Sequence, residues 1–107
     1  MIYQNGLFGF GFWGNMPYGE PTDKLEDFFK YKNTLDKDLV IHHIEGLDQW
    51  LSSERSTDMF TGEKFNAGLI EDGNFQFPVD FLRYYKKLDI GIPPEYEAYL
   101  KTIMPKE

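Results

Sequence analysis

The sequence predicts a single α+β domain over residues 1–107, with a small, largely antiparallel sheet and three to four helices packed on it. Short segments of β type alternate with segments whose apolar residues recur at helical spacing. Hydrophobic residues make up 41% of the 107 residues and aromatic residues 18%, which is enough apolar mass for one core. The chain shows no internal repeat, low-complexity tract or Pro/Ser linker that would divide it.

The N-terminal segment predicts a β-hairpin. In residues 7–13, Phe at every second position alternates with Leu, Gly or Trp, which is the period of a strand. Ile2-Tyr3 precede Asn5-Gly6, a strong hairpin turn signal, and are expected to form the partner strand. The glycines on one face predict that another element approaches closely there. We interpret the segment as core-lining, with an exposed aromatic binding face as the alternative.

The middle of the chain predicts a helix, a strand and a second helix, followed by a loop. A capped helix is expected to begin at Asp23, because apolar residues follow it at i, i+3 and i+4 spacing. Residues 38–45 predict a strand, since β-branched residues are frequent there. Residues 47–51 repeat the helical spacing, and the polar residues 52–63 are expected to form a loop.

The C-terminal part predicts a hairpin and two helices. Residues 65–71 and 75–77 flank Asp72-Gly73-Asn74, which is typical hairpin turn chemistry. Pro78 suits the first turn of a helix that carries apolar residues on one face. Pro93-Pro94 interrupts the chain and opens a last helix with a Tyr- and Leu-lined face.

Charge and cysteine content exclude several function classes. The formal net charge is −7, and the acidic surplus lies within residues 20–80. Because phosphate binding needs a basic face, we expect no direct contact with nucleic acid. The absence of cysteine excludes a disulfide framework, a thiolate metal site and a Cys nucleophile.

No membrane or export segment is expected. Residues 1–19 contain no charged side chain, but they lack the basic start and the small-residue cleavage site of a signal peptide. The longest run without a polar side chain, residues 7–14, is shorter than the roughly 20 residues of a membrane span. We therefore expect a soluble, cytoplasmic protein.

Motifs for cofactors or catalysis are weak. Residues 9–14 match G-x-G-x-x-G, but the Asn-Met-Pro-Tyr-Gly that follows does not open the helix that holds the phosphates. His42 and His43 would point to opposite faces of the expected strand, so they would not share a metal ion. No cofactor is therefore expected. His43 and Glu45 would share a face, which leaves open a small enzyme or ligand-binding domain with an aromatic pocket near His43.

The C-terminal half carries a resemblance. Residues 71–85, Glu-Asp-Gly-Asn-Phe-Gln-Phe-Pro-Val-Asp-Phe-Leu-Arg-Tyr-Tyr, and residues 90–96, Ile-Gly-Ile-Pro-Pro-Glu-Tyr, are similar in style to small bacterial immunity proteins. Those proteins are encoded beside contact-dependent or polymorphic toxins, and they are acidic, aromatic-rich and free of catalytic motifs. The resemblance implies a cytoplasmic, non-enzymatic protein that binds the toxin domain of a sibling cell and blocks it. It transfers no binding residue by position.

These observations favour an inhibitor that captures a cognate toxin through acidic residues and an aromatic anchor. Because the chain is acidic, we expect the toxin to be a basic nuclease. A housekeeping adaptor remains an alternative, and the charge could also serve solubility alone. For Trp50, the sequence favours a core position over an anchor. The expected partner-binding residues lie mostly in or beside expected loops and are Asp58, Phe60, Glu63, Glu71, Asp72 and Trp50.

Overall fold

A five-stranded sheet organises the part of the chain that the computed structural model describes, residues 2–4, 6–13 and 21–104. The strand order is β1-β2-β5-β4-β3. Three of the four neighbouring pairs are antiparallel, and β2 pairs with β5 in parallel. The elements are β1 (Ile2–Gln4), β2 (Leu7–Gly9), α1 (Leu25–Phe28), α2 (Lys37–Glu45), β3 (Gln49–Thr57), β4 (Lys64–Asp72), β5 (Phe75–Pro78), α3 (Val79–Lys87) and α4 (Pro94–Ile103). The predicted α+β class with a largely antiparallel sheet and helices on it is confirmed.

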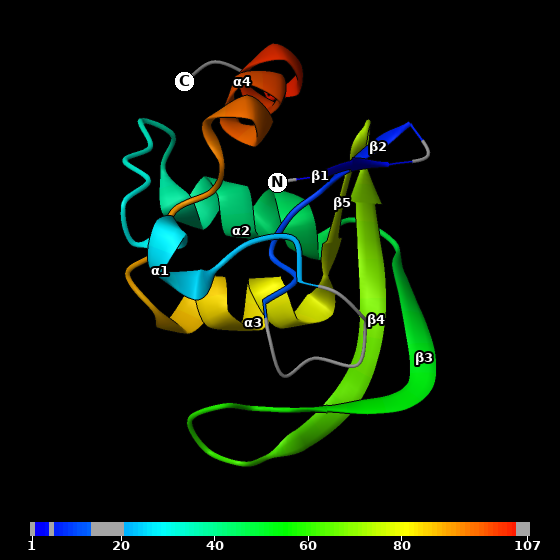
Figure 1. The fold of residues 1–107 in the computed structure, drawn as a ribbon. Coiled ribbons are helices and arrows are strands. Elements are labelled where there is room, and N and C mark those ends of the chain that lie inside the picture. The colour runs from blue at the N-terminus through cyan, green and yellow to red at the C-terminus, as the bar shows by residue number, and fades with distance from the viewer. Residues whose placement is uncertain (1, 5, 14–20, 105–107) are drawn as a thin grey trace.

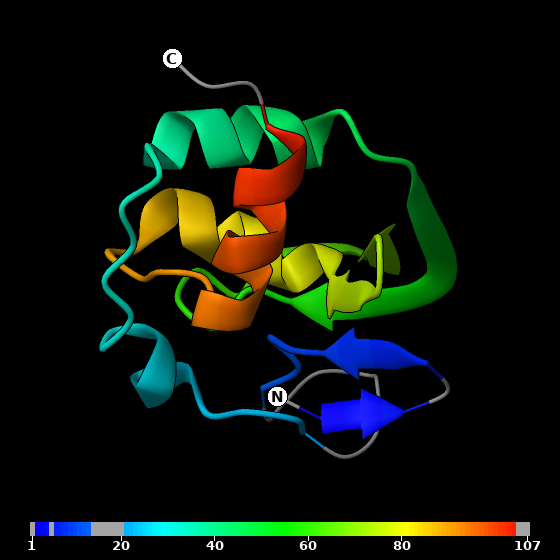
Figure 2. The ribbon, with the colours of Figure 1, turned by 90° about the horizontal axis from the view of Figure 1, so that it is seen from above.

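The helices gather on one side of the sheet, as Figure 1 shows. Helix α3 packs directly on β4 and β5, and α2 packs on α3. Figure 2 shows the same arrangement from above, with α2 running across the outside of the helical layer and the chain turning from it into β3. The β3–β4 hairpin is long, and its tip curves toward α3 (Figure 1).

The core is a cluster of aromatic rings centred on Phe10, which is fully buried. Its ring centroid lies 4.9 Å from that of Phe77 and 5.2 Å from those of Phe81 and Tyr96. Trp13 stacks edge-on against Phe28 in the same cluster. The core-lining interpretation of the N-terminal segment is therefore confirmed for its described residues, since these rings are the largest apolar groups in the interior.

The backbone of this segment differs from the expected strand. Strand β2 ends at Gly9, and Gly11 has φ of +79°, a left-handed conformation that glycine adopts without strain. Phe12 and Trp13 are both buried, so the segment does not keep two separate faces. A Cβ at Gly11 would lie 3.0 Å from the Phe81 side chain, which confirms the predicted close approach at that glycine.

The predicted strand at residues 38–45 is wrong, because these residues form helix α2. Asp36 caps the helix by accepting a hydrogen bond from the backbone N–H of Asp38 at 2.9 Å. Val40 and Ile44, four residues apart, are buried on one face. Their β branches lower helix propensity only slightly, so the i, i+4 spacing and the cap prevail.

The predicted helix at residues 47–51 is also wrong, and the expected loop at 52–63 is too long. Strand β3 begins at Gln49 and pairs antiparallel with β4 as far as Thr57. Pairing with a distant strand overrides the local helical spacing, which in this short segment is worth little by itself. Only residues 58–63 remain as the connecting turn.

Helix α1 is confirmed but begins later than expected. Its N-cap residue is Lys24, and no side chain caps it. The Asp23 carboxylate instead accepts hydrogen bonds from the Gly11 backbone N–H at 3.0 Å and the Thr22 hydroxyl at 2.7 Å. This acid therefore ties the N-terminal core segment to the chain that enters α1.

The two predicted hairpins and the last two helices are confirmed. Gly6 and Gly73, with φ of +79° and +59°, follow β1 and β4 in the two turns. Pro78 is the N-cap of α3, and α4 begins at Pro94. None of the helices in the described ranges is long and apolar enough to cross a lipid bilayer.

Candidate protein-binding surface

Strand β3 forms an edge of the sheet and exposes two large apolar side chains. Trp50 is 59% exposed and Leu51 is 61% exposed. Because side chains alternate along a strand, Leu51 lies on the face toward α3 and Trp50 on the opposite face. The predicted core position of Trp50 is therefore wrong: the residue lies on an edge strand and not on a helix that packs inward.

The outer edge of β3 is only partly protected against pairing with another strand. The register with β4 shifts between Leu51 and Arg55; Glu54 places a charge within that irregularity and Arg55 at its end. Irregularities and charges are the usual means by which proteins prevent edge-to-edge pairing. Residues 49–51 carry neither, so the apolar part of the edge is also the part that is open to a partner strand.

The chain that leads into this edge is acidic. Residues 38–54 contain no Lys or Arg, and their acids Asp38, Glu45, Asp48 and Glu54 are all exposed. Glu45 forms an ion pair with Lys86 at 2.8 Å. We call the exposed side chains of residues 38–54 the α2–β3 face. It combines negative charge with Trp50 and Leu51, which lie on opposite sides of β3. The sequence offered Trp50 as an anchor but favoured a core position for it, and it did not indicate Leu51, because edge position is a long-range property of the sheet.

At the tip of the hairpin, the carboxylate of Asp58 is buried, with 1% of the residue exposed. It accepts hydrogen bonds from Arg83 Nε at 2.8 Å, Lys87 Nζ at 3.0 Å and the backbone N–H groups of Phe60 and Thr61. The hydrogen bond from Arg83 and that from the Phe60 N–H hold the pKa of Asp58 far below its ordinary value. Asp58 therefore fastens the turn to α3 and offers no charge at the surface.

Two other expected contact residues remain accessible beside Asp58. Phe60 is 60% exposed, and its ring lies 6.0 Å from that of Tyr84. The Glu63 side chain is 65% exposed and lies 3.4 Å from Arg83 Nη2. Met59, 41% exposed, extends this small apolar tip.

Asp72 is likewise a structural acid and not a surface one, because the residue is only 6% exposed. Its carboxylate accepts hydrogen bonds from the hydroxyls of Tyr96 at 2.8 Å and Tyr99 at 3.3 Å, and lies 2.8 Å from His43 Nε2. Burial, with the Asp72 charge as the next cause, raises the pKa of Tyr96 well above its ordinary value. The cluster joins α2, β4 and α4. Asp58 and Asp72 do lie in or beside turns, as expected, but both carboxylates are buried, so neither is accessible to a partner.

Glu71, the remaining expected contact residue, is half-buried on β4 and accepts a hydrogen bond from Gln76 at 3.2 Å. The structure thus brings Phe60 and Glu63 together at the hairpin tip. Trp50, Glu71 and Asp72 lie elsewhere on the sheet, so the six expected residues do not form one patch.

His43 does not pair with Glu45, because both lie on helix α2 and each has another partner. His43 contacts Asp72, whereas Glu45 pairs with Lys86. Successive residues on a helix are about 100° apart, so the expected opposite placement of His42 and His43 is also wrong. Both oxygens of Asp72 are occupied by its neighbours, which makes the His43–Asp72 pair part of a structural cluster.

Among the residues that the structure describes, no three His, Asp or Glu side chains lie close enough to hold a metal ion. No protein family, curated protein or solved structure matches the chain.

Proposed function

We propose that this chain is a non-enzymatic, cytoplasmic inhibitor of the immunity type, which neutralises a basic toxin protein by binding it through the α2–β3 face. The observation that carries the proposal is the pair of exposed apolar residues, Trp50 and Leu51, on an edge strand within an acidic stretch that contains no Lys or Arg. Exposed apolar patches that polar residues surround are typical of protein–protein interaction sites.

Charge and apolar burial have separate roles in this mechanism. The exposed acids Asp38, Asp48 and Glu54 attract a basic partner over a distance and raise the association rate. Trp50 then becomes buried in the contact, where a desolvated Trp anchor contributes about 2 kcal/mol or more. Because β3 is the last strand of the sheet, the outer edge of residues 49–51 allows the partner to add a strand.

The hairpin tip supplies a second contact region in this proposal. Phe60 and Glu63 offer an aromatic ring and a carboxylate at its surface. Asp58 and Asp72 have indirect roles, since Asp58 fixes the tip to α3 and Asp72 joins α2 to the sheet and α4.

Affinity capture from the native cells tests this function with a matched pair of variants. Trp50→Ser removes the proposed anchor, whereas Phe29→Ser removes an apolar side chain that is 46% exposed at the end of α1. We expect one basic protein to be retained at low salt and released at moderate salt. It should be retained by the wild type and Phe29→Ser, and lost from Trp50→Ser. The captured protein, once purified, should lose its toxic activity when the wild-type chain is added.

Three results would contradict the proposal. The first is that no protein is retained at either salt concentration. The second is equal retention by Trp50→Ser and Phe29→Ser, which would remove the face from the contact. The third is a retained partner whose activity the chain does not change, which would favour an adaptor over an inhibitor.

A further inference from the structure

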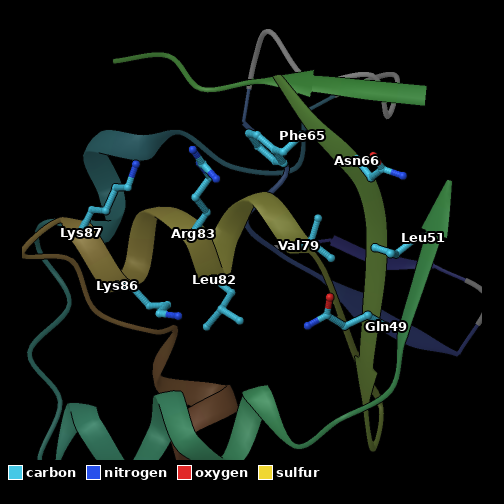
Figure 3. Close-up of a pocket in the computed structure, with 9 residues that line it drawn as sticks. All are labelled: Gln49, Leu51, Phe65, Asn66, Val79, Leu82, Arg83, Lys86 and Lys87. Carbon is cyan, nitrogen blue, oxygen red and sulfur yellow. The ribbon is translucent and has the colours of Figure 1, made fainter. Parts of the chain in front are cut away.

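A pocket of about 440 Å³ lies between α3 and the β3–β4 hairpin, as Figure 3 shows. Its size falls in the range of about 300–1,000 Å³ that is typical of small-molecule sites. The lining side chains come from β3, β4 and α3. They are Gln49, Leu51, Phe65, Asn66, Val79, Leu82, Arg83, Lys86 and Lys87.

The lining combines an apolar surface with positive charge. Four lining residues are apolar, two carry amides and three are cationic, whereas none is acidic. The carboxylates that pair with these cations, Glu45, Asp58 and Glu63, lie outside the lining. Arg83 lies 4.4 Å from the centroid of the Phe65 ring, a cation–π contact that places charge next to the apolar surface.

The two lysines keep hydrogen-bond donors for a ligand. Lys86 pairs with Glu45 at 2.8 Å and Lys87 with Asp58 at 3.0 Å, and the lysine side chains are 46% and 45% exposed. An ammonium group has three N–H donors, so one ion pair leaves the others available. Arg83 has fewer donors left, because it forms ion pairs with both Asp58 and Glu63.

We propose that this pocket binds a small organic anion, namely an aromatic or aliphatic body that carries one carboxylate. The body would cover Leu51, Val79 and Leu82, and the carboxylate would accept a hydrogen bond from Lys86, whose side chain lies on the same side of α3 as Leu82 (Figure 3). This site shares Leu51 with the α2–β3 face but not Trp50, which lies on the opposite face of β3 and does not line the pocket, so a Trp50 variant separates the two proposals.

A matched pair of ligands tests the proposal. 1-Naphthylacetate and 1-naphthylacetamide have nearly the same shape, but only the first carries a charge. Each is titrated into the full chain while backbone amide resonances and the dissociation constant are followed. We expect shifts at the lining residues, and an affinity for the acid about fivefold higher than for the amide. That ratio corresponds to roughly 1 kcal/mol, the upper value for a partly exposed ion pair.

Variants locate the charge that recognises the acid. Lys86→Gln should weaken binding of the acid about fivefold and leave binding of the amide unchanged. Lys30→Gln is the control, since Lys30 is exposed beyond the end of α1 and does not line the pocket. Gln49→Glu keeps the side-chain shape but places a carboxylate in the lining. It should therefore weaken binding of the acid more than binding of the amide.

Each other outcome overturns the proposal. Equal affinities for acid and amide would show that the cations do not select the ligand. Shifts outside the lining residues would place the ligand elsewhere, and the absence of shifts at millimolar concentration would exclude this ligand class. The Trp50→Ser variant should bind the acid as the wild type does. Ligand binding in the pocket can therefore be judged even if the protein-binding function proves wrong.

Discussion

The Asp72 cluster makes a quantitative prediction for Tyr96→Phe. The Tyr96 hydroxyl donates a hydrogen bond of 2.8 Å to the buried Asp72 carboxylate, and Tyr96 is itself fully buried. The substitution removes the hydroxyl and leaves the ring, so it opens no large cavity. Hydrogen bonds to charged groups are worth about 1.5–3 kcal/mol. We therefore expect a loss of about 2 kcal/mol in the free energy of unfolding.

The expected loss converts to a measurable change in Tm. Unfolding 107 residues has an entropy of about 0.22 kcal/mol/K near Tm, so a loss of about 2 kcal/mol lowers Tm by about 9 °C. Tyr99→Phe is the graded comparison, because the Tyr99 hydroxyl lies 3.3 Å from Asp72, beyond the usual O–H···O range. Its loss of about 0.7 kcal/mol should lower Tm by about 3 °C.

Calorimetry or circular dichroism at neutral pH measures both variants. The reasoning fails if Tyr96→Phe lowers Tm by less than Tyr99→Phe does, because the closer and more deeply buried hydroxyl would then contribute less. A Tyr96→Phe protein as stable as the wild type would likewise show that the buried carboxylate gains nothing from this donor.

Three further predictions concern Asp58, two turn glycines and Trp50. Since the folded-state pKa of Asp58 is lowered, its contribution to stability is present above about pH 4 and is lost as pH falls further. The difference in the free energy of unfolding between wild type and Asp58→Asn should therefore become smaller as the pH of the measurement is lowered. Gly62→Ala should cost about 1–2 kcal/mol for its positive φ alone, and urea titration should give a larger loss for Gly73→Ala, whose Cβ would lie 2.6 Å from the Tyr99 hydroxyl. Trp50→Ser should change the free energy of unfolding by less than about 0.5 kcal/mol, because the side chain is 59% exposed; a large loss in the same titration would mean that Trp50 supports the fold.

The sequence was a good guide where local and long-range signals agree. Residues 64–103 contain a turn glycine, two helix-initiating prolines and apolar residues at helical spacing, and all of their predicted elements are present. Each of these signals acts through backbone geometry within a few residues. Such constraints need no knowledge of distant contacts.

The sequence was a poor guide over residues 37–57. There β-branched Val40, Ile41 and Ile44 lie in a helix, while the helical spacing of residues 47–51 lies at the start of a strand. The strand is decided by β4, six of whose nine residues pair with β3 and hold it in place. Pairing partners are distant in the sequence, so a local pattern does not reveal them.

The sequence also did not reveal which acids are buried, and their burial changes where a basic partner would bind. Residues 20–49 and 50–80 each carry a surplus of four acids. In the second segment, however, three aspartates are buried in hydrogen-bonded clusters, whereas no described acid of the first segment is buried. The accessible acids of the first segment include Asp38 and Glu45 on α2, and two of the exposed apolar side chains, Trp50 and Leu51, lie on β3.

Within the α2–β3 face, exposed acids lie next to exposed apolar side chains where α2 leads into β3, at residues 45–51. Asp48 lies between the two, exposed and two residues before Trp50. Exposed charges act mainly on the association rate and buried apolar anchors on the dissociation rate. If the α2–β3 face is the contact, Asp48→Asn should slow association and weaken its salt dependence, while Trp50→Ser should speed dissociation. The same two effects at Phe60 and Glu63 alone would instead place the contact at the hairpin tip.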